Sequence, residues 1–319
     1  MRVDLITGFL GSGKTTFIRR YLAYLKSQGE RVHIIENEFG SVGVDTRLLR
    51  EEDCTIDDLS GCCMCCTGRD KFMAMLINSA TEGCDRVLVE PSGIYDVDEF
   101  FSVMSADAVK AHCEIGSILT IVDAGMDEKH LTKESGYLMY AQLLAAGTVI
   151  VSKTQLYPEG TAEETIKRLN RLIEEDGGGR VLKDTPAEDH PGDVCKKEWD
   201  AFTPEDFERF NMSGYRHPAH ARHKMAHQEI FMSMMLAGRC AGEEDLEERI
   251  RRLFEDPSRG NVLRVKGHIR DLEGNWYEVN STPQKGEIRP VSDIRRGLLV
   301  VIGQNLDEPA IQAAFLPRK

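Results

Sequence analysis

The stretch "RVDLITGFLGSGKTT", residues 2–16, sets the architecture of the N-terminal half of the chain. An apolar run is followed by a glycine-rich loop, and then by apolar residues at helical spacing: Phe17, Ile18, Tyr21, Leu22 and Leu25. The loop fits G-x-x-x-x-G-K-[ST] in the strand–loop–helix context that this motif needs. Its glycines let successive N–H groups face a phosphate chain, and the helix N-terminus adds partial positive charge. The stretch therefore predicts a nucleoside triphosphate site.

Each residue type in this loop suits a part of such a ligand. We expect Lys14 to reach the β- and γ-phosphates and the Thr15 hydroxyl to bind Mg²⁺. The full set of expected nucleotide-binding residues in the loop is Gly8, Gly11, Ser12, Gly13, Lys14, Thr15 and Thr16.

The rest of the first half alternates apolar runs with amphipathic patterns. Runs without polar alternation, typical of strands buried on both faces, cover residues 31–36, 86–90, 117–123 and 147–153. Helical patterns cover residues 68–81, 137–145 and 161–176. This order predicts an α/β fold, a doubly wound and mostly parallel sheet of the P-loop NTPase type, over residues 1–185.

The remainder of the chain predicts a linker and a second, smaller domain. Residues 186–224 are rich in Pro, Gly and Asp and are expected to form an irregular linker, although "TPEDFERF" (203–210) predicts a short helix capped by Thr203. Residues 225–319 predict an α+β domain, with helices at 243–256 and 307–315 between and after several strands.

Charge and composition limit the function. The net charge of −13 argues against partners that are nucleic acids or anionic membranes, which would be repelled. No apolar run approaches the ~18 residues of a membrane helix, and the N-terminus lacks the pattern of a signal peptide. We therefore expect a cytoplasmic, reducing location, where clustered cysteines favour metal binding or redox chemistry over structural disulfides.

The stretch "SGCCMCCTG", residues 60–68, holds four of the nine cysteines. Cys62, Cys63, Cys65 and Cys66 form two overlapping C-x-x-C pairs, and their thiolates would be metal ligands. Adjacent cysteines do not easily converge on one tetrahedral ion, so we expect two or three thiolates for each ion. Other residues, or a second chain in a homodimer, would complete the site. Disulfide redox chemistry is the alternative, because C-x-x-C is also an oxidoreductase spacing.

Taken together, these motifs resemble a known family. "GFLGSGKTT", "ENEFGSVGVD" (36–45), the cysteine loop, "VEPSG" (89–93) and "SKTQ" (152–155) follow the order seen in CobW-like P-loop GTPases, relatives of HypB and UreG. "VLRVKGHI", "WYEVN" and "GLLVVIGQNLD" are similar to the C-terminal domain of CobW-type proteins. The resemblance covers nearly the whole chain except roughly residues 185–225. It implies GTP hydrolysis coupled to the handling of a metal ion or metallocofactor.

The resemblance also implies roles for individual residues. The family's Gly-Cys-x-Cys-Cys motif matches Cys63, Cys65 and Cys66, while Cys62 replaces the glycine. Glu38 is the first candidate to complete that metal site, and His112 and His130 are weaker ones. Glu90 and Asp45 are candidate catalytic carboxylates near Mg²⁺, and Gly93 is expected to approach the γ-phosphate.

The base-reading segment departs from the usual Asn-Lys-x-Asp. Ser152, Lys153 and Gln155 stand there, and Lys153 can lie over the purine. Gln155 replaces the carboxylate that reads guanine, so GTP is favoured and ATP stays an alternative.

Four histidines, His217, His220, His223 and His227, stand at spacings of three and four. Along one helical face such imidazoles could bind a transition metal, whereas the simpler interpretation is a solvated linker.

The sequence thus predicts a slow, cytoplasmic GTPase that acts as a metallochaperone. It would bind Mg²⁺ with its nucleotide and Zn²⁺ or Co²⁺ through Cys62–Cys66, and deliver the metal to a client metalloprotein or a cobalamin or other metal-cofactor enzyme. Slow turnover is expected because no arginine finger is identifiable. The alternatives are a nucleotide-gated dithiol redox or activase protein, serving for example a corrinoid enzyme, and a non-hydrolysing assembly scaffold.

Overall fold

The structure is a computed structural model that describes residues 1–37, 55–58, 67–127, 131, 133–175, 179–183, 193–216, 232–236, 239–240, 242–283, 286–292 and 297–315. The chain divides into two compact units, one containing the described residues through Arg216 and one containing those from Met232 onward. Each unit is considered by itself.

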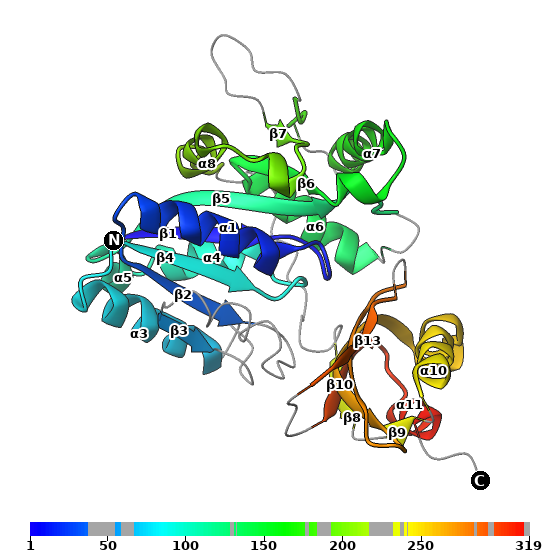
Figure 1. Ribbon diagram of the computed structural model, residues 1–319. Helices are drawn as coiled ribbons and strands as arrows, with labels where there is room; N and C mark the ends of the chain where they lie inside the picture. The colour runs from blue at the N-terminus through cyan, green and yellow to red at the C-terminus, as the bar shows by residue number, and fades with distance from the viewer. Residues whose placement is uncertain are drawn as a thin grey trace. The chain divides into compact units, whose positions relative to one another are not determined.

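The first unit is built on a seven-stranded sheet in the order β3-β2-β4-β1-β5-β6-β7, in which every neighbouring pair is parallel (Figure 1). Its strands are β1 (Arg2–Thr7), β2 (Val32–Asn37), β3 (Thr55–Asp58), β4 (Arg86–Pro91), β5 (Glu114–Asp123), β6 (Thr148–Ser152) and β7 (Val194–Cys195). The predicted α/β fold with a doubly wound, parallel sheet is confirmed. Strands β3 and β7 were not predicted.

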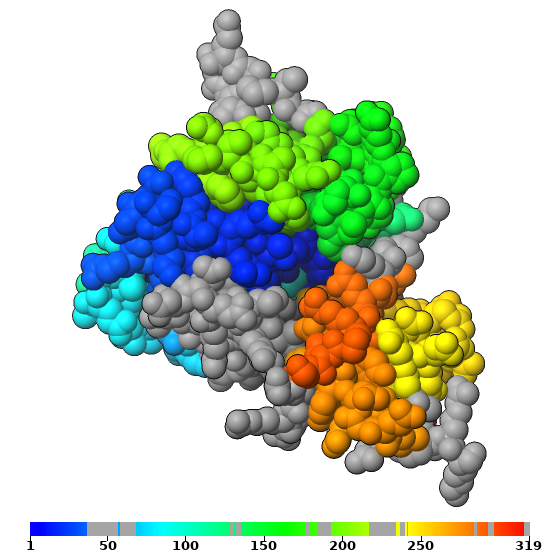
Figure 2. Space-filling model, in the orientation of Figure 1, coloured from blue at the N-terminus to red at the C-terminus, as the bar shows by residue number. Residues whose placement is uncertain are grey.

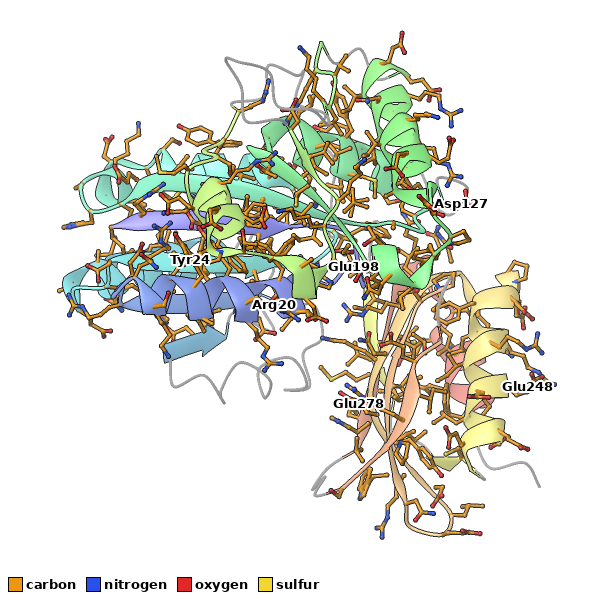
Figure 3. The ribbon with its side chains drawn as sticks, turned by 45° about the horizontal axis from the view of Figure 1, so that its top comes forward. Arg20, Tyr24, Asp127, Glu198, Glu248 and Glu278 are labelled. Atoms are coloured by element: carbon orange, nitrogen blue, oxygen red, sulfur yellow. The ribbon has the colours of Figure 1, made fainter. Side chains whose placement is uncertain are left out.

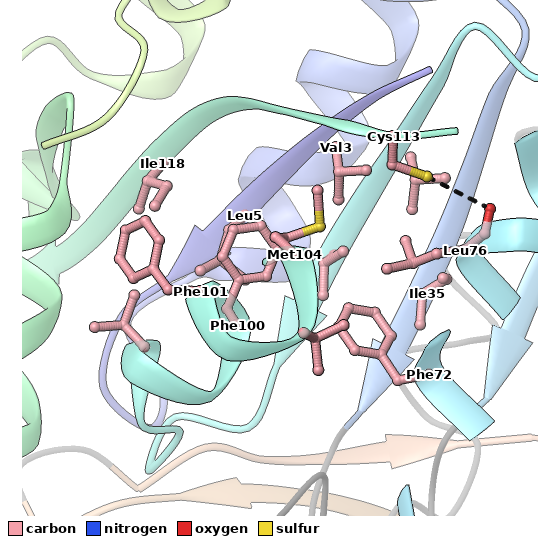
Figure 4. Close-up of a cluster of buried hydrophobic side chains, with 14 of the residues drawn as sticks. Val3, Leu5, Ile35, Phe72, Leu76, Phe100, Phe101, Met104, Cys113 and Ile118 are labelled. Carbon is pink, nitrogen blue, oxygen red and sulfur yellow. Dashed lines mark hydrogen bonds between the residues drawn. The ribbon is translucent and has the colours of Figure 1, made fainter. Parts of the chain in front are cut away.

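Helices cover both faces of this sheet. They are α1 (Lys14–Ser27), α3 (Thr67–Thr81), α4 (Val97–Met104), α5 (Asp107–Lys110), α6 (Lys133–Ala145), α7 (Thr161–Glu175) and α8 (Pro204–Asn211). Apolar residues of α1 and α8 fill the core on one face. The other face packs against α3, α4, α5, α6 and α7, and Figure 4 shows part of that core, with Phe72 of α3 and Phe100 of α4.

The described part of the expected linker is folded into the first unit. Residues 193–216 contain β7, the 3₁₀ turn Trp199–Ala201 and α8, which begins with the predicted Thr203 cap and its reciprocal partner Asp206. Aromatic rings hold this segment to α1: Phe17 contacts Trp199, Phe202 and Phe210 at centroid distances of 5.6–6.4 Å. Figure 2 shows α1 and this segment forming a continuous surface. The burial of Trp199 and Phe210 stabilises the packing of residues 193–216 on α1.

The second unit is an α+β structure. Strands β12 (Ile288–Val291), β11 (Trp276–Ser281), β10 (Asn261–Asp271), β13 (Leu298–Gln304) and β8 (Met232–Leu236) pair antiparallel in this order, and β9 (Arg239–Cys240) pairs parallel with β10. Helices α10 (Glu243–Glu255) and α11 (Glu308–Ala314) cover one face with Leu246, Ile250 and Ile311. Buried and partly exposed side chains therefore alternate along β11, as in a sheet with one apolar face.

A buried histidine on β2 lies between the elements on either side of the cysteine-rich stretch and is hydrogen-bonded to one of them. His33 Nδ1 lies 2.5 Å from Ser79 Oγ on α3, and His33 Nε2 lies 3.4 Å from Asp57 Oδ2 on β3. Ser79 Oγ donates its hydrogen to Met75 O, so Nδ1 must donate to Ser79. Burial lowers the pKa of His33, and the charges of Asp57 and Glu82 only partly oppose this shift.

This lowered pKa predicts a loss of stability in acid. Because the folded pKa lies below the unfolded value, the unfolded chain binds more protons as the pH falls through about 6.5. The stabilisation is complete above that pH and is lost below it. We expect the free energy of unfolding in urea to decrease from pH 7.5 to 5.5, and to decrease less in His33→Gln. His112→Gln is the control for removing an exposed histidine, and equal slopes in both variants would contradict this role.

Candidate functional site

The predicted nucleotide-binding residues meet at one edge of the first sheet. Because all seven strands are parallel, their carboxyl ends share this edge, and ligands of open parallel sheets bind there. The glycine-rich loop follows β1, Glu90 and Gly93 lie at the end of β4, and Ser152 ends β6. The fold therefore brings together three segments that are far apart in the sequence.

The glycine-rich loop passes close to the neighbouring strand. Gly8 has φ +141°, and a Cβ there would lie 2.2 Å from the carbonyl oxygen of Ile121 on β5, so another residue would force the loop away. Ser12 N donates to Phe9 O at 3.2 Å and closes the turn. Within the described residues, the buried Ser12 hydroxyl has no hydrogen-bond partner, and a phosphate oxygen could accept this donor.

Lys14 places its positive charge inside this loop. Its side chain is 7% exposed, and Nζ donates to Gly8 O at 3.0 Å and to Phe9 O at 3.5 Å. Lys14 is also the first residue of α1, so the ammonium group lies where the helix N-terminus favours an anion. Thr16, which follows in the same turn, is exposed.

A hydroxyl and a carboxylate meet beside the loop. Thr15 Oγ1 donates to Glu90 Oε1 at 2.8 Å, although the two residues are 75 positions apart. Both groups are oxygen ligands of the kind that Mg²⁺ prefers, so this arrangement fits a magnesium ion. Gly93, three residues further on, lies against the loop backbone: a Cβ there would be 2.5 Å from Leu10 N. Only glycine permits this approach of the two loops.

A second buried carboxylate was missed by the sequence analysis. Glu36 on β2 is the register partner of Glu90 on β4, and both are buried. Ile34 and Leu88, two residues earlier in these strands, lie in the core beneath α1. Since side chains two residues apart share a face, both carboxylates face the α1 side. Glu36 opens the quoted "ENEFG" stretch, but its burial depends on strand pairing.

The segment predicted to read the base is anchored to the glycine-rich loop and to β5. Ser152 Oγ lies 2.6 Å from Ser12 O and 3.2 Å from Val122 O. Lys153 has φ +58°, and its Nζ forms an ion pair with Asp123 Oδ2 at 2.7 Å. Gln155 follows in an exposed 3₁₀ turn, Thr154–Leu156. Asp123, at the end of β5, was not predicted as part of the site.

Asp123 also affects a neighbouring tyrosine. Burial, together with the charge and hydrogen bond of Asp123, raises the pKa of Tyr157 to about 12. The carboxylate additionally accepts the backbone N–H of Gly125 at 2.8 Å. Asp123 thereby holds the position of the Lys153 ammonium group.

Trp199 is a further residue near the loop that the sequence did not indicate. An ideal Cβ at Gly13 would lie 3.4 Å from its indole ring, and the ring also packs on Phe17 of α1. Strand β7 has only two residues, so no hydrophobic periodicity marked the segment that carries Trp199.

Several predicted site residues lie outside the described residues: Glu38, Asp45, Cys62, Cys63, Cys65, Cys66, His130, His217, His220, His223 and His227. The elements flanking the cysteines are described, since β3 ends at Asp58 and α3 begins at Thr67. Within the described part of the chain, no group of three or more His, Cys, Asp and Glu side chains is arranged to hold a metal ion.

His112 lies at the opposite edge of the sheet from the glycine-rich loop. It comes just before β5, and its carbonyl accepts from the N-terminal amine at 3.0 Å. The connection from β3 to α3 starts at the carboxyl edge. The cysteines lie outside the described residues, so the suggestion that His112 helps them to bind a metal stays a prediction.

None of the helices in the described residues is long and apolar enough to cross a membrane.

Comparison with known proteins identifies the family. The model for the CobW/HypB/UreG nucleotide-binding domain matches residues 2–176, and the model for the C-terminal domain of the cobalamin synthesis protein cobW matches residues 237–317. The zinc chaperone YeiR of Escherichia coli strain K12 is 33% identical over 184 residues, which cover 57% of this chain and 54% of YeiR. The zinc chaperone CobW of Sinorhizobium sp. is 31% identical over 181 residues, 48% of this chain and 50% of that protein.

These alignments span about half the length of the curated relatives. Among solved structures, the Zn(II)-bound YjiA GTPase from E. coli aligns over 99% of this chain and 98% of its own, at 19% identity and a TM-score of 0.41. The match to the first family model covers more than half of the chain and confirms the resemblance seen in the motifs. The chain therefore belongs to the CobW/HypB/UreG family of nucleotide-binding proteins.

Proposed function

We propose that this protein is a GTP-hydrolysing metallochaperone that binds a transition metal through Cys62–Cys66 and delivers it to a client metalloprotein. The observation that carries the proposal is the contact between Thr15 and Glu90 at 2.8 Å, beside the buried Lys14. A hydroxyl, a carboxylate and an ammonium group at a helix N-terminus form a site suited to a triphosphate and its magnesium ion.

The nucleotide half of the proposal assigns a role to each described group. Lys14 and the loop N–H groups bind the phosphates, and Thr15 and Glu90 hold Mg²⁺, which neutralises charge on the transferred phosphoryl group. Lys153 forms an ion pair with Asp123, and in this proposal its side chain would lie over the purine face. Guanine is the proposed base. Adenine is the alternative, because Gln155 stands in place of the carboxylate that distinguishes guanine from adenine.

The metal half depends on the chemistry of the cysteines and on the family. Thiolates at C-x-C-C spacing suit Zn²⁺ or Co²⁺, and Glu38 is the proposed additional ligand. The relatives YeiR and CobW are named zinc chaperones. The proposed client is a metalloprotein or an enzyme of a metal-cofactor pathway.

Contacts between helices α3 and α4 support coupling between the two halves. Helix α3 begins one residue after Cys66, and Arg69 in its first turn donates to Ser102 O on α4 at 3.3 Å. Helix α4 follows the Gly93 loop, and Phe72 of α3 packs in the same core as α4. A nucleotide-dependent movement of that loop could therefore reach the helix that follows the cysteines.

A calorimetric titration tests metal binding and coupling together. We expect anaerobically purified protein to bind Zn²⁺ or Co²⁺ stoichiometrically. We also expect affinities that differ about 100-fold between the GDP-bound and the non-hydrolysable GTP-bound protein, equivalent to ~2.7 kcal/mol. Cys65→Ser should abolish stoichiometric binding, because a thiolate ligand is lost.

Cys84→Ser is the matched control, since Cys84 lies between α3 and β4 and burial raises the pKa of its thiol. Equal metal affinities in both nucleotide states would contradict the coupling. An oxidisable dithiol without metal would favour the redox alternative, and nucleotide binding without phosphate release would favour the scaffold. Repeating the titration with ATP analogues reports the base preference.

A further inference from the structure

A buried chain of hydrogen bonds connects β1 with the loop after β4, on the sheet face opposite α1. Thr7 Oγ1 lies 2.9 Å from Thr120 Oγ1 of β5, and Thr120 Oγ1 donates to the carbonyl oxygen of Gln142 on α6 at 3.0 Å. Gln142 Nε2 donates to Tyr95 O at 3.0 Å. The side chains of Thr7, Thr120 and Gln142 are each 1% exposed.

The direction of the first hydrogen bond follows from the second. A threonine hydroxyl has one hydrogen, and Thr120 uses it on the Gln142 carbonyl. Thr7 must therefore donate to Thr120. Gln142 thus joins the two loops: its main-chain carbonyl accepts from Thr120 of β5, which in turn accepts from Thr7 of β1, and its carboxamide donates to Tyr95 O.

The two ends of this chain are the two loops that face the proposed γ-phosphate. Thr7 directly precedes Gly8 of the glycine-rich loop. Tyr95 closes the turn that contains Gly93, since Tyr95 N donates to Ser92 O at 3.1 Å. Gly93 itself lies against Phe9 and Leu10 of the glycine-rich loop. The position of this turn is therefore set on one side by Leu10 and on the other by Gln142.

We propose that Gln142 is a positioning residue, which holds the Ser92–Tyr95 turn where a triphosphate, but not a diphosphate, contacts it. The proposal rests on the proposed nucleotide function. The loop N–H groups bind phosphates common to both nucleotides, and Lys14 reaches the β-phosphate of both as well as the γ-phosphate. The turn, by contrast, contributes only when the γ-phosphate is present. Gln142 touches no substrate atom and acts through Tyr95.

Gln142→Met removes the donor while keeping a flexible side chain of similar length. The Tyr95 carbonyl then loses its buried partner, and the turn is free to move away. We expect the ratio of affinities for a non-hydrolysable GTP analogue and GDP to fall about 10-fold, with GDP affinity changed less than 3-fold. Amide hydrogen exchange at residues 93–95 should also accelerate.

Thr148→Val is the matched control. Thr148 is buried on β6, and its hydroxyl has no hydrogen-bond partner within the described residues. The isosteric change should leave the affinity ratio and the exchange at residues 93–95 unchanged. If Gln142→Met does not fold, Thr120→Val removes the hydroxyl between Thr7 and Gln142 in the same chain of hydrogen bonds, and a smaller fall in the same ratio is expected.

The measurements separate the possible failures. An unchanged ratio in Gln142→Met, or equal losses for GTP analogue and GDP, would overturn the positioning role while nucleotide binding stands. If the unmodified protein binds neither nucleotide, the proposed function fails and this role fails with it.

Discussion

Lys14→Ala is expected to lower the affinity for a GTP analogue by at least about 100-fold, equivalent to ~2.7 kcal/mol. The physical reason is the position of the ammonium group, which is buried inside the loop within 3.5 Å of two of its carbonyl oxygens. Each charge-assisted hydrogen bond to a phosphate contributes roughly 1.5–3 kcal/mol, and alanine provides none. Phosphate release from GTP should become undetectable. Fluorescence titration with a labelled nucleotide and a phosphate-release assay measure both effects.

Lys26→Ala is the matched control, because Lys26 is an exposed residue in the last turn of the same helix. It should bind nucleotide like the unmodified protein. Unchanged affinity in Lys14→Ala would show that the glycine-rich loop does not bind the phosphates, and the proposed function would have to be abandoned.

Arg86→Met is expected to destabilise the first unit by about 3–5 kcal/mol. Arg86 is buried at the start of β4, and it donates to Asp4 at 2.6 Å, to Glu30 at 2.6 and 3.0 Å and to Asn211 at 2.9 Å. It therefore joins β1, the turn after α1 and the end of α8. Methionine would leave the fully buried Asp4 without its charged partner, and this unpaired charge is the main cost.

The effect should appear as a fall in the midpoint of thermal unfolding on the order of 10 °C. Arg20→Met is the control; Figure 3 shows Arg20 on α1. Its ion-pair partner Asp200 is 90% exposed, and ion pairs at the surface contribute at most about 1 kcal/mol to stability. Adding Asp4→Asn to Arg86→Met should recover part of the loss. Equal effects of Arg86→Met and Arg20→Met would show that the buried network does not stabilise the unit.

The strands that the sequence predicted are those buried on both faces. The runs at 2–7, 86–90 and 117–123 correspond to β1, β4 and β5, because a central parallel strand must be apolar throughout. Strands β3 and β7 have the sequences "TIDD" and "VC", which show no such pattern. These two strands form because the neighbouring strands β2 and β6 provide backbone hydrogen-bond partners. Their formation therefore depends on strand pairing and not on their amino-acid composition.

For the candidate site, the contiguous motif could be predicted and the contacts between segments could not. Spacing within residues 8–16 is enough to predict roles for Lys14 and Thr15, since the geometry expected of a phosphate-binding loop is local to one loop and one helix. Glu36, Asp123 and Trp199 carry no local signal, because their place beside the loop follows from strand order and from the docking of residues 193–216.

The amino-acid sequence by itself determined the parallel α/β architecture, the phosphate-binding loop and the crowding of thiols before α3. These properties depend on periodicity and on groups that are adjacent in the chain. Only the tertiary structure determined that Thr15 donates a hydrogen bond to Glu90 and that Gln142 donates one to Tyr95 O. The same holds for the hydrogen bonds from Arg86 to the side chains of three other residues, two carboxylates and one amide. Those contacts join residues that are 47 to 125 positions apart. Strand order and the packing of helices and loops against the sheet, which no local pattern encodes, bring them together.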